Sequence, residues 1–376
     1  MVPFSWSFWG AVLEHAELQA DALRRLGHDP RIICGNDPPG QFTRSLHPRH
    51  GRDGPPPADV IPIGRSVIVP ANGSLPNIIL SPRAFFRIKN VLERERFDVI
   101  HVHEPMTPIP CVAALSLWDG PTVGTWHASG ELNWMRFAKL TWGFLADRVD
   151  QRIAVSPMAA QSANRWLPGE YEIVPNGVLI PLQADPGGRE HRIVFVGRHD
   201  ARKGMHVLLR AWPEIRRRTG AELHVIGADP LRVRLELTRY RVPDDGITIL
   251  GFVDQDTLTA ELLAAKALVA PSLGGESFGM VLTRGMACAT PVVASDISGY
   301  RDVMTPETAV SFPPGDREAL ADAIESLLAD EPRRQAMGAA GRELAQERYS
   351  WDAIAQRLVE IYTSAIGSVT ATAAGL

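Results

Sequence analysis

The sequence predicts an α/β protein with two Rossmann-like, doubly wound halves, each a parallel sheet covered by helices. Short apolar segments typical of buried parallel strands alternate with helical segments along the whole chain. Residues 176–189 are rich in Pro and Gly and lack periodicity, so we place a linker there. A chain of 376 residues is also long for one hydrophobic core, which favours two domains.

In the first half, a helical pattern from Gly10 to Leu26 is followed by a short strand at 32–34 and by a Pro-, Gly- and His-rich loop at 36–57. A helix is predicted at 83–95. Further strands are expected at 98–103, 122–126, 152–156 and 172–174.

In the second half, strands are predicted at 191–197, 223–227, 247–250, 268–271, 292–295 and 309–312. An amphipathic helix at 351–366 presents Ile354, Leu358 and Ile361 on one side. The expected domains are therefore 1–180 and 190–350, followed by the helix 351–366. Two such halves predict a ligand cleft between them, at the carboxyl ends of the strands.

Composition excludes several classes of protein. A net charge of −4 and a pI near 6.3 argue against a nucleic-acid partner. The three cysteines are too scattered for a disulfide framework or a zinc site, which indicates a reducing compartment. No apolar run reaches the ~18 residues of a membrane span. The aromatic start lacks the basic region and cleavage site of a signal peptide, so we expect a cytoplasmic protein.

The segment 270–282 is the strongest candidate for a ligand site. An apolar run ends at Pro271, and a loop with two glycines then delivers one carboxylate, Glu276, ahead of helix-compatible residues. Proteins of the α/β class present polar groups to ligands in this way, at a helix N-terminus. A capped turn in which Glu276 merely favours the helix dipole is the alternative.

A second loop, at 197–204, carries Arg198 and Lys203 between a strand and a helix. Backbone N–H groups at a helix N-terminus favour an anion. Arg supplies forked donors and Lys a point charge, a suitable pair for a diphosphate. A solvated basic loop is the alternative. Because Glu276 lies on another strand-to-helix loop of the same sheet, we favour the diphosphate.

Two further patterns could indicate metal. His101 and His103 alternate onto one face of a strand, but no third ligand has a persuasive spacing, so a structural role is favoured. The run Asp254-Gln255-Asp256 resembles the metal-nucleotide triad of some sugar transferases, yet a helix cap explains it better.

Several motifs together resemble the large retaining glycosyltransferase family with the GT-B fold. They are His-Glu-Pro at 103–105, Gly-Thr-Trp-His at 124–127, Val-Pro-Asn-Gly-Val at 174–178, Gly-Arg…Arg-Lys-Gly at 197–204, Gly-Gly-Glu-Ser-Phe-Gly at 274–279 and Val-Val-Ala-Ser-Asp at 292–296. The chain is most similar to the actinobacterial phosphatidylinositol mannosyltransferases, over nearly its whole length. The resemblance also implies that the last helix crosses back onto the first domain.

The resemblance implies a nucleotide-sugar donor, GDP-mannose by closest likeness, bound mainly to the C-terminal domain. In that family's pattern Arg198 and Lys203 bind the diphosphate, Glu276 contacts the donor sugar, and His127 lies beside that sugar. These four residues would carry catalysis. The other expected donor-binding residues are Gly10, Ser277, Phe278, Gly279, Met280, Val281 and Arg284.

The implied reaction retains the anomeric configuration and needs no metal or other cofactor. The implied acceptor is a phosphatidylinositol-like lipid or a small polyol, and Asn72 and Ser74 match acceptor-side residues, with His127 facing both substrates. Ala71 and Asn77 replace an aromatic and a basic residue near the acceptor, and Leu13 replaces a glutamine.

Three other departures from the family pattern bear on activity. Arg284 stands where the motif has its second glutamate, and a guanidinium cannot accept a hydrogen bond from a ribose hydroxyl. The family's Gly-Gly turn reads Gly10-Ala11, and a methyl group there would crowd the diphosphate or clash at a positive φ. The chain also begins several residues late, so we expect a short or missing first strand, as from a start codon assigned too far downstream.

Two alternatives of function stay open at this stage. One is a UDP-sugar-dependent glycosyltransferase of the same fold, and the other is a noncatalytic binding protein, which Arg284 and Ala11 motivate.

The helix at 83–95 also allows two interpretations. Its basic residues alternate with apolar ones, so it could lie on an anionic lipid surface, at the inner face of the plasma membrane. It could equally be an ordinary helix with its apolar side packed inside. The residues concerned are Arg83, Phe85, Phe86, Arg87, Ile88 and Lys89.

Overall fold

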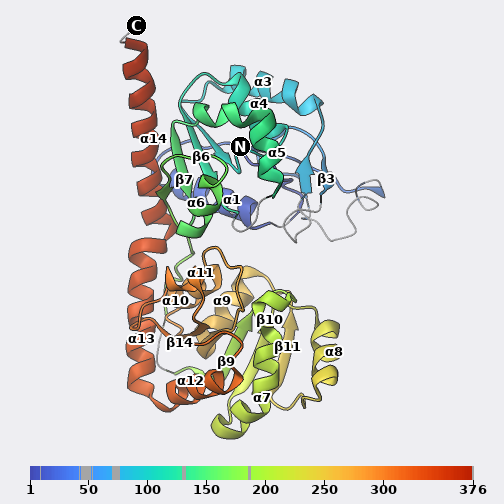
Figure 1. Ribbon diagram of the computed structural model, residues 1–376, viewed down its shortest axis with the longest axis vertical. Coiled ribbons are helices and arrows are strands. Elements are labelled where there is room, and N and C mark those ends of the chain that lie inside the picture. Colours follow the sequence, from blue (N-terminus) through green and yellow to red (C-terminus); the bar gives the residue numbers. More distant parts are fainter. Residues whose placement is uncertain are drawn as a thin grey trace. The chain divides into compact units, whose positions relative to one another are not determined.

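The computed structural model describes residues 1–8, 10–41, 43, 52, 54–69, 77–128, 133–184 and 188–374. The chain forms two compact units (Figure 1). The first comprises Met1–Gly177 together with Trp351–Leu376, and the second comprises Val178–Ser350.

The second unit contains one six-stranded sheet in the order β11-β10-β9-β12-β13-β14, with every pairing parallel. Its strands are β9 (Glu190–Val196), β10 (Glu222–Ile226), β11 (Ile247–Gly251), β12 (Ala265–Ala270), β13 (Val292–Ser295) and β14 (Ala309–Phe312). This is the doubly wound order, which reverses direction between β9 and β12. Ligands of such sheets bind outside the carboxyl ends of the strands at that reversal.

Helices cover both faces of this sheet because successive strand residues point to opposite sides. Phe195 of β9 packs in the core that also contains Trp212 of α7 and Ile324 of α12, whereas Val194 packs in the core that contains Met286 of α10. The helices of this unit are α7 (Met205–Thr219), α8 (Pro230–Tyr240), α9 (Gln255–Ala264), α10 (Met280–Ala287), α11 (Ser298–Arg301), α12 (Arg317–Ala329) and α13 (Glu331–Leu344).

Aspartate side chains cap several of these helices at their first residues. Asp254 Oδ1 accepts a hydrogen bond of 2.7 Å from the backbone N–H of Thr257 and so starts α9. Asp229 and Asp316 cap α8 and α12 in the same manner. The interpretation of Asp254 as a helix cap is therefore confirmed.

The first unit holds a four-stranded parallel sheet in the order β5-β6-β7-β8 and two pairs, β1-β2 and β3-β4. The backbone of Met1 and Val2 runs between β1 and β5, since the Val2 N–H donates to the Ile33 carbonyl and the His103 N–H donates to the Met1 carbonyl. The strands are β1 (Ile32–Cys34), β2 (Val60–Pro62), β3 (Ser66–Ile68), β4 (Asn77–Ile79), β5 (Ile100–His103), β6 (Thr122–Trp126), β7 (Gln151–Ala154) and β8 (Glu172–Ile173).

The C-terminal helix α14 (Trp351–Ala374) belongs to this first unit. Its Ile354, Leu358 and Ile361 are buried in one cluster with Ala22 and Leu23 of α1. The side of α14 that the sequence pattern predicted to be apolar is therefore the side that packs in the core. The other helices of the unit are α1 (Ala11–Arg25), α3 (Arg83–Glu95), α4 (Pro110–Leu117), α5 (Asn133–Trp142), α6 (Pro157–Asn164) and the 3-10 segment η1 (Gly143–Arg148).

All eleven predicted strands are present, displaced by at most a few residues, and the helix at Arg83–Glu95 has the predicted bounds. The strands β2, β3 and β4, of three residues each, were not predicted. Within the described parts of the chain, no helix combines the length and the apolar character that crossing a membrane requires.

Candidate functional site

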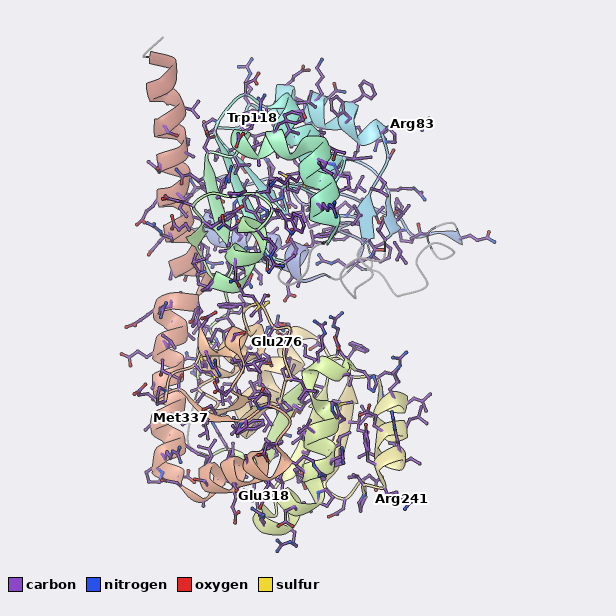
Figure 2. All side chains as sticks on the ribbon, in the orientation of Figure 1. Arg83, Trp118, Arg241, Glu276, Glu318 and Met337 are labelled. Carbon is purple, nitrogen blue, oxygen red and sulfur yellow. The ribbon has the colours of Figure 1, made fainter. Side chains whose placement is uncertain are left out.

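Two loops leave the carboxyl ends of the neighbouring strands β9 and β12, at the reversal of strand order. The first loop, residues 197–204, contains the 3-10 turn η2 (Ala201–Lys203) and leads into α7. The second, residues 271–279, carries Glu276 and leads into α10 (Figure 2). Both loops therefore lie where a doubly wound sheet binds its ligands.

The two loops are packed against each other through backbone. Gly204 has a φ of 68°, and a Cβ atom there would lie 1.8 Å from the carbonyl oxygen of Pro271. The Leu273 N–H also donates a 2.7 Å hydrogen bond to the Arg202 carbonyl. Only glycine permits both the left-handed conformation and this close approach.

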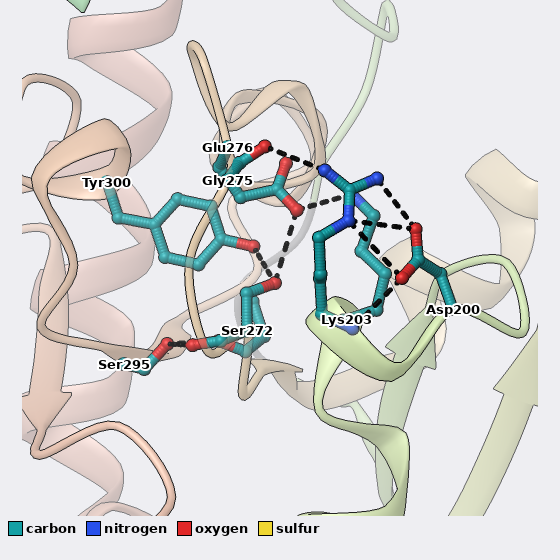
Figure 3. Close-up of polar contacts among 9 residues, drawn as sticks. Asp200, Lys203, Ser272, Gly275, Glu276, Ser295 and Tyr300 are labelled. Carbon is teal, nitrogen blue, oxygen red and sulfur yellow. Dashed lines mark hydrogen bonds and ion pairs between the residues drawn. The ribbon is translucent and has the colours of Figure 1, made fainter. Parts of the chain in front are cut away.

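This packing brings Lys203 and Glu276 together. Lys203 Nζ lies 2.7 Å from Glu276 Oε1, with side chains 25% and 13% exposed, so the pair is only partly screened by water (Figure 3). Beside it, Arg202 pairs with Asp200 and donates a long hydrogen bond of 3.4 Å to the Gly275 carbonyl. The Arg202 guanidinium holds the pKa of Asp200 below its usual value.

A chain of hydroxyl groups supports Glu276 from the protein side. Ser272 Oγ donates to Glu276 Oε1 at 3.3 Å and lies 2.8 Å from the Tyr300 hydroxyl, which must then be the donor to Ser272 (Figure 3). Burial, together with the charge of Glu276, raises the pKa of Tyr300, so its proton is retained. Neither Ser272 nor Tyr300 was predicted from the sequence, although Ser272 lies within the segment singled out.

The helices α7 and α10 begin beside this pair, and neither has an acidic residue in its first turn. Their first N–H groups have no partner within the helix, and the helix dipole adds positive potential there. Lys203 and these helix starts give the site the character of an anion site. Arg198, on the same loop as Lys203, is exposed.

The remaining residues of the 276–284 segment lie in different environments. Phe278 is buried, 4% exposed, with its ring against Tyr349, so its side chain is not available to a ligand. Gly279 precedes α10 with a φ of 78°. Ser277, Met280, Val281 and Arg284 are half-buried.

In the first unit, Gly10 is the extended residue that precedes α1, and Ala11 is the first residue of that helix. Ala11 is absent from the described non-glycine residues with positive φ. The backbone clash expected for an alanine at this turn is therefore not realised. Asn72 and Ser74 lie outside the described residues, so their expected role is not described further.

His127 follows β6 and is half-buried, and it belongs to a cluster with two buried imidazoles, those of His15 and His103. Its Nε2 lies 3.0 Å from Nδ1 of His103 at the end of β5, and His15 of α1 lies against both rings. Burial is the first cause that lowers the pKa of each imidazole, so all are neutral at pH 7. The sequence analysis paired His103 with His101 and missed His15, because α1 lies far from both along the chain.

Glu104 fixes the backbone next to His127. Its Oε1 accepts hydrogen bonds of 2.9 Å and 2.8 Å from the N–H groups of His127 and Ala128. Glu104 itself has a positive φ of 53°, uncommon for a side chain of this kind. Burial raises the pKa of Glu104, and the two backbone hydrogen bonds oppose that rise.

Two family models match the chain, one in each half. Glycosyltransferase Family 4 matches residues 13–179, and Glycosyl transferases group 1 matches residues 190–330. A phosphatidyl-myo-inositol mannosyltransferase of Propionibacterium freudenreichii is 34% identical and covers 100% of this chain and 96% of its own. The one of Mycobacterium leprae is 33% identical, covering 96% and 94%. The chain belongs to the glycosyltransferase family.

Solved structures agree with this fold. Sucrose-phosphate synthase from Thermosynechococcus elongatus has a TM-score of 0.71 at 22% identity and covers 96% of this chain and 94% of its own. HepE of Anabaena in complex with UDP has a TM-score of 0.70 at 19% identity, covering 96% and 99%. The predicted GT-B fold and the predicted glycosyltransferase are thus confirmed.

We expect the glycosyltransferase to lose stability when Gly204 acquires a side chain. Gly204→Ala combines a left-handed alanine, which costs about 1–2 kcal/mol, with a clash against Pro271, which adds about 1–3 kcal/mol. Gly220→Ala is the matched control, because Gly220 has the same φ of 68° but nothing within 4 Å of its Cβ position. Urea unfolding measures both, and equal losses of unfolding free energy would contradict the proposed contact.

Proposed function

We propose that this glycosyltransferase moves a mannosyl group from a nucleotide sugar, GDP-mannose, to a phosphatidylinositol-like lipid or a small polyol, with retention of anomeric configuration. The observation that carries the proposal is the Lys203–Glu276 pair between two helix N-termini at the reversal of strand order. The full-length similarity to phosphatidyl-myo-inositol mannosyltransferases supports the choice of sugar and acceptor.

The donor diphosphate would take the place that Glu276 holds at Lys203 in the free protein. Lys203, the exposed Arg198 and the N–H groups that begin α7 and α10 supply positive charge without any metal ion. The same groups would stabilise the negative charge that grows on the leaving phosphate. Glu276, released from Lys203, would accept hydrogen bonds from hydroxyls of the donor sugar.

His127 is assigned to the donor sugar in this proposal. It is a neutral imidazole, so it can donate or accept one hydrogen bond at a sugar hydroxyl without adding charge. The two backbone contacts of Glu104 would hold it in position.

A donor and acceptor screen tests the proposal directly. Purified protein is incubated with radiolabelled GDP-mannose, GDP-glucose, UDP-glucose or UDP-galactose and either phosphatidylinositol, free inositol or a bacterial lipid extract. We expect label to transfer from GDP-mannose alone, with the α-anomer in the product. Transfer only from a UDP-sugar would overturn the donor, and an inverted product would overturn the retaining mechanism.

Substituting each member of the charged pair tests its own role, because Glu276 is assigned to the transfer step and Lys203 to donor binding. We expect Glu276→Ala to lower the transfer rate at least ~10²-fold, and Lys203→Ala to weaken donor binding by about 1.5–3 kcal/mol. Initial rates and calorimetry with the donor measure the two effects. The control is Glu343→Ala, an exposed carboxylate of α13 in the same unit. Kinetics like those of the control in either variant would contradict the assignment.

We also propose that the enzyme contacts anionic membrane peripherally, from the cytoplasmic side, through α3. Ile88 of this helix is buried in the core, whereas Phe85 and Phe86 are 38% and 68% exposed. Arg83, labelled in Figure 2, and Arg87 are exposed on the same helix. Packing inside the protein therefore accounts for only part of the apolar residues, and an exposed aromatic pair beside basic residues suits a lipid headgroup layer.

Co-sedimentation with anionic liposomes at low salt tests this contact. We expect the double variant Phe85→Ser/Phe86→Ser to bind at least ~10-fold more weakly, since burying one such ring in lipid contributes about 1.5–3 kcal/mol. Leu235→Ser, at a 59% exposed position of α8, is the control and should leave binding unchanged. If wild-type protein stays in the supernatant, the membrane contact is refuted.

A further inference from the structure

Three imidazoles of the first unit converge on one point. His15, His103 and His127 each offer a ligand nitrogen, and these three nitrogens lie within 4.8 Å of one another. We propose that they form a binding site for one divalent transition-metal ion of the zinc class. Three histidines with an open fourth position are a common donor set for such an ion.

The positions of the rings suit a shared ion. His103 Nδ1 and His127 Nε2 are 3.0 Å apart, and two nitrogens on one tetrahedral zinc ion are separated by about 3.3 Å. The His15 ring is 4.8 Å from the His127 ring and 5.5 Å from the His103 ring, edge-on to both. A shift of about 1.5 Å, shared among the side-chain torsions, would complete the coordination distances.

A hydrogen bond from a neighbouring residue also orients one ring of the cluster. His15 Nδ1 lies 3.0 Å from Asn176 Oδ1, which requires the proton on Nδ1 and leaves the lone pair of Nε2 for a ligand. Metal-binding histidines commonly have such a partner at the second nitrogen. Burial keeps the pKa of His15 at about 4 and those of the other two well below the usual value. Metal binding requires only that the proton between His103 Nδ1 and His127 Nε2 move to the other nitrogen of its own ring.

His101 is a neighbouring, half-buried histidine whose two ring nitrogens already have partners. Its ring stacks on His103 at 4.5 Å, so it belongs to the same cluster. However, its Nδ1 lies 2.7 Å from the Tyr362 hydroxyl and its Nε2 lies 2.7 Å from Thr125 Oγ1. Both nitrogens are engaged within the protein, which makes His101→Gln a control that disturbs the cluster without removing a ligand.

The metal site does not depend on the proposed function, but both proposals involve His127. An ion bound to Nε2 of His127 leaves only the Nδ1–H of that ring to donate to a sugar hydroxyl. If His127 instead uses Nε2 at the sugar in the role proposed above, the ion and the donor exclude each other, and the metal inhibits transfer.

Cobalt titration of the full chain tests the site, because tetrahedral Co²⁺ with nitrogen ligands absorbs visibly. We expect one equivalent to bind, Zn²⁺ to displace it, and the melting temperature to rise with metal concentration. His15→Gln and His103→Gln should each weaken Co²⁺ binding at least ~10²-fold, and His101→Gln should change it less than about 3-fold. Circular dichroism and melting without metal check the folding of each variant.

Asn176→Ala provides an independent variant that retains all three ligands. By freeing the His15 tautomer it should weaken Co²⁺ binding ~10–100-fold. Absence of a visible spectrum, or binding that His15→Gln and Asn176→Ala both leave unchanged, would refute the site. If metal binds as expected but the saturated enzyme transfers sugar at its full rate, the metal site stands and His127 does not use Nε2 at the sugar.

Discussion

The contact between Gly204 and the Pro271 carbonyl is the constraint on which the site in the second unit depends. Reversal of strand order puts the loops after β9 and β12 side by side, but it does not fix their separation. The missing side chain at Gly204 lets the backbones touch, and this close approach allows Lys203 and Glu276 to meet at 2.7 Å. The Lys203–Glu276 pair at the two helix N-termini therefore depends on the absence of a side chain at Gly204.

Sequence reasoning recovered features that depend on local pattern and missed features that depend on contacts distant along the chain. Lys203 and Glu276 were predicted because each follows a recognisable strand and precedes a helix. Tyr300 was missed because its bond to Ser272 spans 28 residues and leaves no local signal. His15 was missed for the same reason, since its partner Asn176 lies 161 residues away.

The polar groups at the ends of the strands are stabilised differently in the two units. In the second unit, partly buried ions of opposite sign neutralise each other, and a ligand with its own charge can replace one partner. In the first unit, burial removes charge from the imidazoles, so they interact through lone pairs and N–H groups. The first environment suits a diphosphate, and the second suits a neutral sugar hydroxyl or a metal ion.

Arg284 bears on which part of the donor this enzyme recognises. It lies in the last turn of α10, where the negative end of the helix dipole favours a cation and disfavours a carboxylate. Its presence is therefore explained by helix stability without reference to a ligand. Because a guanidinium accepts no hydrogen bond, it cannot hold ribose hydroxyls as an acid would. In the proposed function, the affinity for the donor then rests on the diphosphate and the sugar, through Lys203 and Glu276, more than on the ribose.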